Sequence, residues 1–205
     1  MATSHNGWPV LSRGSNRLVT LPQITGRVLT GPVWVVFYWL ARQFETLVEP
    51  IRRDWSWGYA YRRIAGSVRW SNHASGTAID LNAPKHPAGR TGTFTKTQTK
   101  TILTLISEAG GIIRWGATFR DEMHFEISPA TNPAAVERFA VKLLQDALND
   151  RLSVDLVVDG IRGPKTADAL KVFQASAGLV VDGIDGPKTW AALTNPRPTE
   201  GDQAA

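Results

Sequence analysis

The spacing of apolar residues gives the N-terminal part of the chain a mixed pattern. In residues 33–51 apolar side chains recur three and four positions apart, which predicts a buried amphipathic helix. A second helix is predicted from Thr95, because Thr95-Lys96-Thr97-Gln98 forms a capping box, and it ends at Gly110-Gly111. Short apolar runs over 77–81, 111–115 and 124–127 predict strands. This region is therefore expected to combine helices with a sheet.

Alternation along two of these strands gathers polar side chains on one face. Successive side chains of a strand point to opposite faces. Asp80 therefore lies on the face opposite Ile79 and Leu81, which are core candidates. By the same rule His124 and Glu126 share a face of their own strand. Each strand thus presents polar groups on the side away from its apolar residues.

The C-terminal part of the chain has a helical pattern and an internal repeat. One apolar stripe runs through 136–148, with Asn132-Pro133 as a helix start, and shorter helices are predicted near 169–177 and 188–193. The segment 156–166 recurs as 179–189 with ten of eleven positions identical. Each copy reads as a tight Asp-Gly turn followed by a Gly-Pro helix start.

These patterns predict an α+β protein with two domains. The first, over 1–128, should have an antiparallel sheet flanked by helices. A short linker over 129–135 leads to a small all-α domain of three helices over 136–194. The polar, proline-containing tail over 195–205 is expected to be disordered.

Composition excludes several classes of protein. The 205 residues include no cysteine, so the fold has neither disulfides nor thiolate metal sites. The longest apolar segment, 32–41, is about half the roughly 20 residues that a membrane span needs, so we expect a protein that is not membrane-embedded. The polar first residues carry no signal-peptide pattern. We expect a monomer.

The net charge of +5 suits an anionic partner. Arg and Lys are scattered, with short doublets at Arg52-Arg53 and Arg62-Arg63, and no basic run or nucleic-acid motif occurs. We therefore expect no nucleic-acid partner. An anionic cell-wall polymer fits the same charge.

Three residues form a candidate metal site. His73 and Asp80 flank a run of small residues, and His124 follows in a predicted strand. Two imidazoles and one carboxylate with an open fourth position are typical of catalytic zinc. The other two histidines are expected to bind no metal: His5 lies in a terminus that should fray, and His86 should be a rim or turn residue.

Two motifs resemble those of a known family. Ser-Asn-His-Ala-Ser-Gly-Thr-Ala-Ile-Asp over 71–80, followed by Asp-Glu-Met-His over 121–124, is similar to the S-x-H-x-x-G-x-A-x-D and (D/E)-x-x-H motifs of zinc peptidases that cut peptidoglycan stem peptides. This family includes D-Ala-D-Ala carboxypeptidases and the L-alanyl-D-glutamate peptidases of phage endolysins. The resemblance covers about 55–127. The repeat with its D-G-x-x-G-P-x-T turns resembles the three-helix peptidoglycan-binding domain over about 136–194.

The resemblance implies roles for individual residues. It implies Zn²⁺ bound by His73, Asp80 and His124. It implies a general base at Asp121. Glu122 is the alternative base, although the simpler interpretation is that Glu122 is a solvated neighbour without a catalytic role. Arg62 or, alternatively, Arg63 is the candidate that stabilises the oxyanion. Ser71 is a candidate for a hydrogen bond to the substrate or to a ligand. Glu126 is a candidate partner that orients a ligand or an arginine.

Taken together, these features predict an endolysin that hydrolyses a peptide bond in peptidoglycan, with L-alanyl-D-glutamate as the expected bond. A D,D-carboxypeptidase or D,D-endopeptidase is the alternative. A non-catalytic, zinc-containing wall-binding protein is a second alternative. Without a signal peptide, the protein should be made in the host cytoplasm and act at the bacterial cell wall after release.

Overall fold

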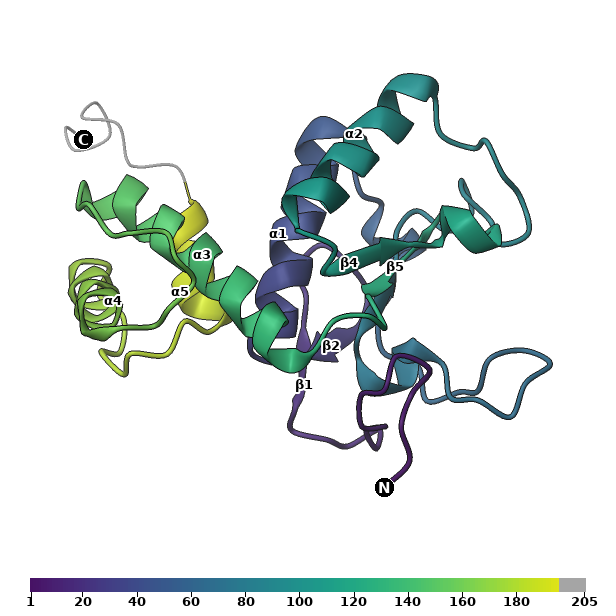
Figure 1. The fold of residues 1–205 in the computed structure, drawn as a ribbon, viewed down its shortest axis with the longest axis horizontal. Coiled ribbons are helices and arrows are strands. Elements are labelled where there is room, and N and C mark those ends of the chain that lie inside the picture. Colours follow the sequence, from purple (N-terminus) through teal and green to yellow (C-terminus); the bar gives the residue numbers. More distant parts are fainter. Residues whose placement is uncertain (196–205) are drawn as a thin grey trace. The chain divides into compact units, whose positions relative to one another are not determined.

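The structure is a computed structural model, and it describes residues 1–195. It divides into two compact units, Met1–Phe139 and Ala140–Ala205 (Figure 1). Positions 196–205 of the predicted tail lie outside the described residues. Helix α3 (Pro133–Leu152) begins inside the range predicted as a linker, because Asn132 caps it by accepting from the Ala135 backbone N–H at 2.8 Å.

The first unit contains the predicted antiparallel sheet. Its strands are β3 (Ala78–Asp80), β4 (Ile113–Trp115) and β5 (His124–Ile127), in the order β3-β5-β4. Asp80 pairs directly with His124, and Ala78 pairs with Glu126. Residues directly opposite each other in an antiparallel pair project from the same face. The register therefore brings the Asp80 carboxylate and the His124 imidazole side by side.

Two helices cover this sheet and complete the core. Helix α1 (Pro32–Leu47) packs against α2 (Lys96–Glu108), and α2 also contacts β4. The predicted capping box of Thr95 and Gln98 is present. Helix α1 was predicted to reach residue 51 but ends at Leu47, because Pro50 disfavours helical backbone at the preceding residue. Phe44 lies edge-on to Phe125, with ring centres 5.9 Å apart, and joins α1 to the sheet.

A second, two-stranded sheet was not predicted. Strands β1 (Leu18–Thr20) and β2 (Arg27–Leu29) pair antiparallel. The Leu29 backbone N–H donates to the Gly76 carbonyl at 2.9 Å, so β2 buttresses the turn that carries His73. Gly76 has φ +70°, and a Cβ there would lie 2.6 Å from the Leu29 nitrogen. Only glycine satisfies both constraints.

The second unit is helical, as predicted. The part of α3 that lies in it is followed by α4 (Pro164–Ser176) and α5 (Pro187–Thr194), each of which has its proline in the first turn. The repeated Asp-Gly turns have Gly160 and Gly183 at φ +75° and +71°. Within residues 1–195, no helix combines the length and apolarity that crossing a bilayer requires.

Gly116 packs closely against the backbone segment that carries Asp121 and His124. A Cβ at Gly116 would lie 2.1 Å from the Asp121 carbonyl oxygen and 3.0 Å from the His124 Cβ. We expect Gly116→Ala to lower the free energy of unfolding by about 1–3 kcal/mol, because the backbone at 121–124 must move. Urea unfolding would measure the loss. Gly14→Ala is the matched control, since nothing lies within 4 Å of its Cβ position. Equal stability of the two variants would contradict this packing.

Candidate metal centre

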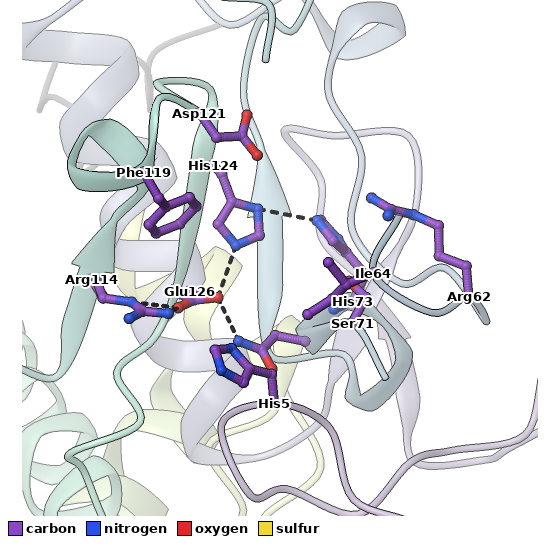
Figure 2. Close-up of a pocket in the computed structure, with 11 residues that line it drawn as sticks. His5, Arg62, Ile64, Ser71, His73, Arg114, Phe119, Asp121, His124 and Glu126 are labelled. Atoms are coloured by element: carbon purple, nitrogen blue, oxygen red, sulfur yellow. Dashed lines mark hydrogen bonds and ion pairs between the residues drawn. The ribbon is translucent and has the colours of Figure 1, made fainter. Parts of the chain in front are cut away.

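Six of the eight predicted site residues line one pocket in the first unit, and Asp80 and Arg63 do not (Figure 2). Its volume is about 410 Å³. Side chains from strands β4 and β5 and from neighbouring turns surround it. The pocket is lined by His5, Arg62, Ile64, Ser71, Asn72, His73, Arg114, Phe119, Asp121, His124 and Glu126.

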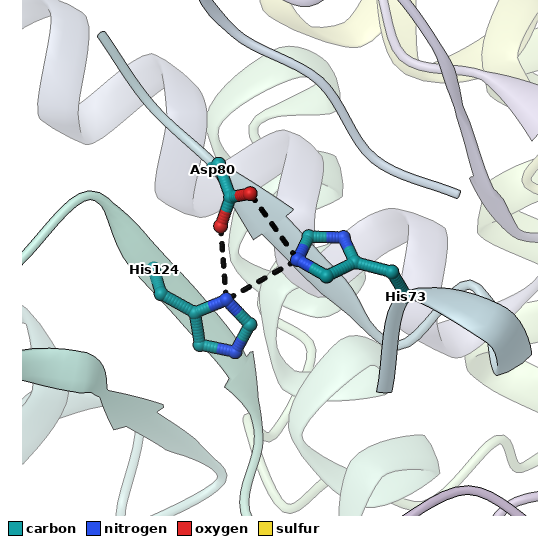
Figure 3. A group of neighbouring side chains, drawn as sticks. All are labelled: His73, Asp80 and His124. Carbon is teal, nitrogen blue, oxygen red and sulfur yellow. Dashed lines mark hydrogen bonds and ion pairs between the residues drawn. The ribbon is translucent and has the colours of Figure 1, made fainter. Parts of the chain in front are cut away.

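His73, Asp80 and His124 form a compact buried group (Figure 3). His73 lies on a short 3₁₀ turn over Asn72–Ser75, Asp80 ends β3, and His124 begins β5. His73 Nε2 is 3.3 Å from His124 Nδ1 and 3.3 Å from Asp80 Oδ2, and His124 Nδ1 is 2.9 Å from Asp80 Oδ1. Their exposed fractions are 1%, 1% and 7%. Three polar side chains thus meet away from solvent.

The outer hydrogen bonds of the two imidazoles determine where their protons lie. His73 Nδ1 is 2.7 Å from the Gly58 carbonyl oxygen, which can only accept, so Nδ1 carries the proton and Nε2 has a free lone pair. His124 Nε2 is 2.9 Å from a Glu126 carboxylate oxygen, so its Nδ1 has the free lone pair. In these tautomers both lone pairs face the Asp80 carboxylate. In these neutral tautomers three electron-pair donors point at one another, so either a proton on His124 or a metal ion must lie between them.

This donor set fits a metal ion. Ligands held about 2.0–2.1 Å from a tetrahedral zinc lie about 3.3 Å from one another, and the observed separations of 2.9–3.3 Å are close to this value. Burial opposes the charged form of His124, but hydrogen bonds to Asp80 and Glu126 raise its pKa to about 9. Burial also opposes ionisation of Asp80, yet both histidines hold its pKa far below its usual value. The surroundings therefore favour a positive charge between these groups.

Glu126 holds the metal-facing histidine in place. One of its oxygens accepts from His124 Nε2 and from the Asn72 side-chain amide. The other accepts from Arg114 Nε at 2.6 Å and pairs with the same guanidinium through Nη2. Burial opposes ionisation of Glu126, but these partners lower its pKa. Ser71 Oγ accepts from the His73 backbone N–H at 3.3 Å, so Ser71 caps the turn that carries this ligand.

Asp121 contributes a buried oxygen that no described protein group pairs with. Its Oδ1 is inaccessible to solvent and has no hydrogen-bond partner within residues 1–195. Burial raises the pKa of Asp121, with a further contribution from the charge of Asp80, although His124, His73 and Arg62 oppose the shift. The carboxyl group lines the pocket beside the His73–His124 pair (Figure 2). A buried acceptor without a protein partner is suited to a water or substrate proton.

The geometry separates the two pairs of alternatives that the sequence left open. Arg62 lines the pocket, whereas the Arg63 guanidinium lies 4.6 Å from the centre of the Trp70 ring and donates to the Val68 carbonyl. Glu122 accepts from the Gly92 and Thr93 backbone N–H groups at 2.7 and 2.8 Å and is buried. The interpretation of Glu122 as a solvated neighbour is therefore wrong, because its carboxylate anchors a loop.

Two other histidines differ from their predicted positions. His86 was expected at a rim or turn, and it does lie in a turn, where its backbone N–H donates to the Asn82 carbonyl at 3.2 Å. It is not at a rim but fully buried, with Nε2 2.9 Å from Glu49 and its ring stacked 3.6 Å from that of Phe94. A carboxylate partner and an aromatic face compensate for its burial. His5 was expected in a frayed terminus but lines the pocket, and its backbone N–H donates to the Trp70 carbonyl at 2.9 Å.

The placement of His5 depends on its neighbour. The Asn6 side-chain amide donates to Thr77 Oγ1 at 2.9 Å and to the Ile127 carbonyl at 3.0 Å. Asn6 and Ile127 are 121 positions apart in the chain, so no local sequence pattern predicts this contact. Arg114 was missed too, although a signal existed: it is a charged residue within an apolar strand, and it pairs directly across the sheet with Glu126.

The donor set generates a metal-content prediction. We expect His73→Ala and His124→Ala to lose bound metal, because each removes one of three converging lone pairs. His5→Ala is the matched control, since it also alters a pocket histidine but touches none of the donors. Metal per chain after dialysis against zinc, measured by elemental mass spectrometry, checks this. Full metal content in His73→Ala would overturn the assignment.

Comparison with family models gives two matches. Residues 65–127 match the model described as D-alanyl-D-alanine carboxypeptidase, and residues 138–193 match the model of a peptidoglycan binding domain. The first match includes all three donors and Asp121 but begins after Arg62. Searches of curated proteins and of solved structures found no match. Within the chain, residues 65–127 thus match a peptidase family and residues 138–193 match a peptidoglycan-binding domain, and this combination supports a peptidase that acts on the cell wall.

Proposed function

We propose that the chain is a zinc-dependent endolysin that hydrolyses the L-alanyl-D-glutamate bond of the peptidoglycan stem peptide. The observation that carries this proposal is the buried donor set of His73, Asp80 and His124 beside Asp121, whose Oδ1 has no hydrogen-bond partner within residues 1–195. Structural zinc is usually enclosed by four protein ligands. Three donors opening on a pocket are suited to catalysis, which disfavours a non-catalytic wall-binding role.

His73, Asp80 and His124 would hold the zinc. When bound, zinc supplies Lewis-acid chemistry, in which it acidifies water and polarises the scissile carbonyl. Asp121 accepts the proton of the attacking water and delivers it to the leaving amine. The raised pKa of Asp121 brings the carboxyl closer to the pH at which it can both take and release a proton. Glu126 keeps His124 in the tautomer with a free Nδ1 lone pair.

Arg62 is the cation available for developing negative charge. Its side chain lines the same pocket as Asp121 and is exposed, so it can approach a bound substrate (Figure 2). A guanidinium offers fixed donors to an oxyanion or a carboxylate. The neighbouring Arg114 is already engaged by Glu126 and stacks on Phe119, with 5.1 Å from its Cζ to the ring centre. Arg62 is therefore our candidate for the oxyanion.

The extent of the pocket supports cleavage of an interior bond. His5 also lines a second hollow of about 370 Å³, together with Thr3, Ser4, Val68, Arg69 and Trp70. The two hollows share His5, and a second hollow beside the site suits a chain that extends on both sides of the cleaved bond. The family description favours the alternative, a D,D-carboxypeptidase that releases terminal D-alanine. In either case, the peptidoglycan-binding domain would hold the enzyme on its insoluble substrate, and we propose that wall cleavage after release from the host cytoplasm leads to lysis.

Mass spectrometry of the products distinguishes these reactions. Purified peptidoglycan digested by the zinc-loaded chain should yield stem fragments that begin with D-glutamate and glycan strands that keep L-alanine. Free D-alanine would instead identify a carboxypeptidase, and separation of cross-linked stems would identify a D,D-endopeptidase. A digest unchanged by zinc loading or chelation would contradict the proposal of a zinc enzyme.

The base assignment is tested by two neighbouring variants. We expect Asp121→Asn to keep zinc and to lose about 10²–10⁴-fold in kcat, the usual contribution of a general base. Glu122→Gln should lose stability rather than chemistry, because Glu122 holds the loop at 92–93. Hydrolysis of a synthetic stem peptide, measured beside thermal unfolding, separates the two effects. An inactive but stable Glu122→Gln with a normal Asp121→Asn would transfer the role to Glu122.

The two adjacent arginines form another matched pair. Arg62→Ala should lower kcat more than it raises KM, because an oxyanion partner acts mainly on developing charge. Arg63→Ala should leave kcat near normal, since its guanidinium is occupied by Trp70 and the Val68 carbonyl. Steady-state kinetics on the same stem peptide measures both. A loss of kcat confined to Arg63→Ala would exchange the assignments.

A further inference from the structure

The two repeats of the C-terminal unit build the same hydrogen-bonded loop twice. Gln145 Nε2 donates to Asp159 Oδ1 at 2.9 Å, and Gln174 Nε2 donates to Asp182 Oδ1 at 2.8 Å. Each glutamine also accepts from the backbone N–H of the glycine after that aspartate, at 2.9 Å in both copies. Both glutamines are almost fully buried. Each loop therefore has the same fixed shape.

Each loop shapes one pocket, and the two pockets have equal volumes of about 480 Å³. They are lined by equivalent residues of the two copies: Val157, Asp159, Ile161, Gly163, Pro164, Lys165 and Thr166 in the first, and Val180, Asp182, Ile184, Gly186, Pro187, Lys188 and Thr189 in the second. Val157 and Val180 are 75% and 78% exposed. Apolar side chains that stay exposed at equivalent positions of both repeats are candidates for contact with a ligand.

The one position at which the repeats differ joins the two loops. Arg162 occupies it in the first copy and Asp185 in the second, and Arg162 Nη2 lies 2.7 Å from Asp185 Oδ1. Because this position carries opposite charges in the two copies, it forms an ion pair between the two loops. The ion pair therefore holds together the two loops that carry the pockets.

The lining chemistry favours a peptide that carries a carboxylate. Lys165 and Lys188 are exposed near the helix starts of α4 and α5, and within residues 1–195 neither is in an ion pair. Asp159 and Asp182 each accept from a glutamine amide and from a backbone N–H, which satisfies part of their charge within the loop. Among the described lining residues there is no aromatic ring on which a sugar could stack. Each pocket offers valine and isoleucine methyl groups and a lysine ammonium group. A stem peptide offers the complementary groups, which are alanine methyl groups and a carboxylate.

We propose that the C-terminal domain has two adjacent stem-peptide-binding pockets, one in each repeat, that engage the same peptidoglycan network together. This inference rests on the proposed role of the domain in holding the wall. The second pocket binds more tightly, because the first also contains Asp155, whose counterpart in the second repeat is Gly178. Two linked sites raise the apparent affinity for an insoluble polymer by roughly 10²–10⁴-fold over one site, without any new contact.

The test uses the full chain with Asp121→Asn, so that the peptide is not cut. Calorimetric titration with a soluble stem tetrapeptide should give three sites per chain, one in the catalytic pocket and one in each repeat. Either Val157→Asp or Val180→Asp should reduce the number to two. Both valines are exposed, so the fold should tolerate the change, and the new charge repels a carboxylate. Val172→Asp is the matched control, because Val172 is 58% exposed but lines neither pocket. The peptide-free disaccharide should not bind.

Sedimentation with purified cell walls gives a second readout. Each single variant should lower wall affinity by about 10²-fold or more, with the larger loss for Val180→Asp, and the double variant should not sediment. Fewer than three sites per chain, binding of the disaccharide alone, or a double variant that sediments normally would overturn the two-pocket proposal while leaving wall binding intact. If the chain with only Asp121→Asn fails to sediment, the proposed wall-holding role fails as well.

Discussion

The pairing of Asp80 with His124 across the β3–β5 ladder is the constraint on which the rest of the site depends. It brings a carboxylate within 2.9 Å of an imidazole nitrogen in a fully buried position. Such a pair is costly to bury unless a cation or proton lies between the groups. The His73 lone pair, at 3.3 Å from both, increases this requirement. The fold therefore leaves these groups incomplete unless a positive charge joins them.

The surrounding structure maintains this arrangement through hydrogen bonds to the outer nitrogens of the two imidazoles. The Gly58 carbonyl takes the outer proton of His73, and Glu126 takes that of His124. Arg114 and Asn72 in turn occupy the oxygens of Glu126. The His73 turn is held from behind by β2 through Gly76. Asp121, which lines the same pocket, differs from these groups, because within residues 1–195 its Oδ1 has no hydrogen-bond partner.

Much of this site could be predicted from the sequence because its determinants are local. Strand alternation placed Asp80, His124 and Glu126, and the capping box at Thr95 located α2. The contacts that failed prediction are long-range. Asn6 fixes His5 at the pocket through a partner 121 positions away, and Glu49 draws His86 into the core from 37 positions away. The spacing of hydrophobic residues predicts local helices and strands but not hydrogen bonds between residues far apart in the sequence.

The central claim is that two imidazoles and one carboxylate jointly bind a metal. X-ray absorption at the zinc edge of the zinc-loaded chain measures this ligand set directly. Our account expects two histidine nitrogens and one carboxylate oxygen at about 2.0–2.2 Å, with a fourth light atom from solvent. The His124→Ala chain should retain too little zinc to give this spectrum. A spectrum with fewer than two imidazoles in the unmodified chain would contradict the account.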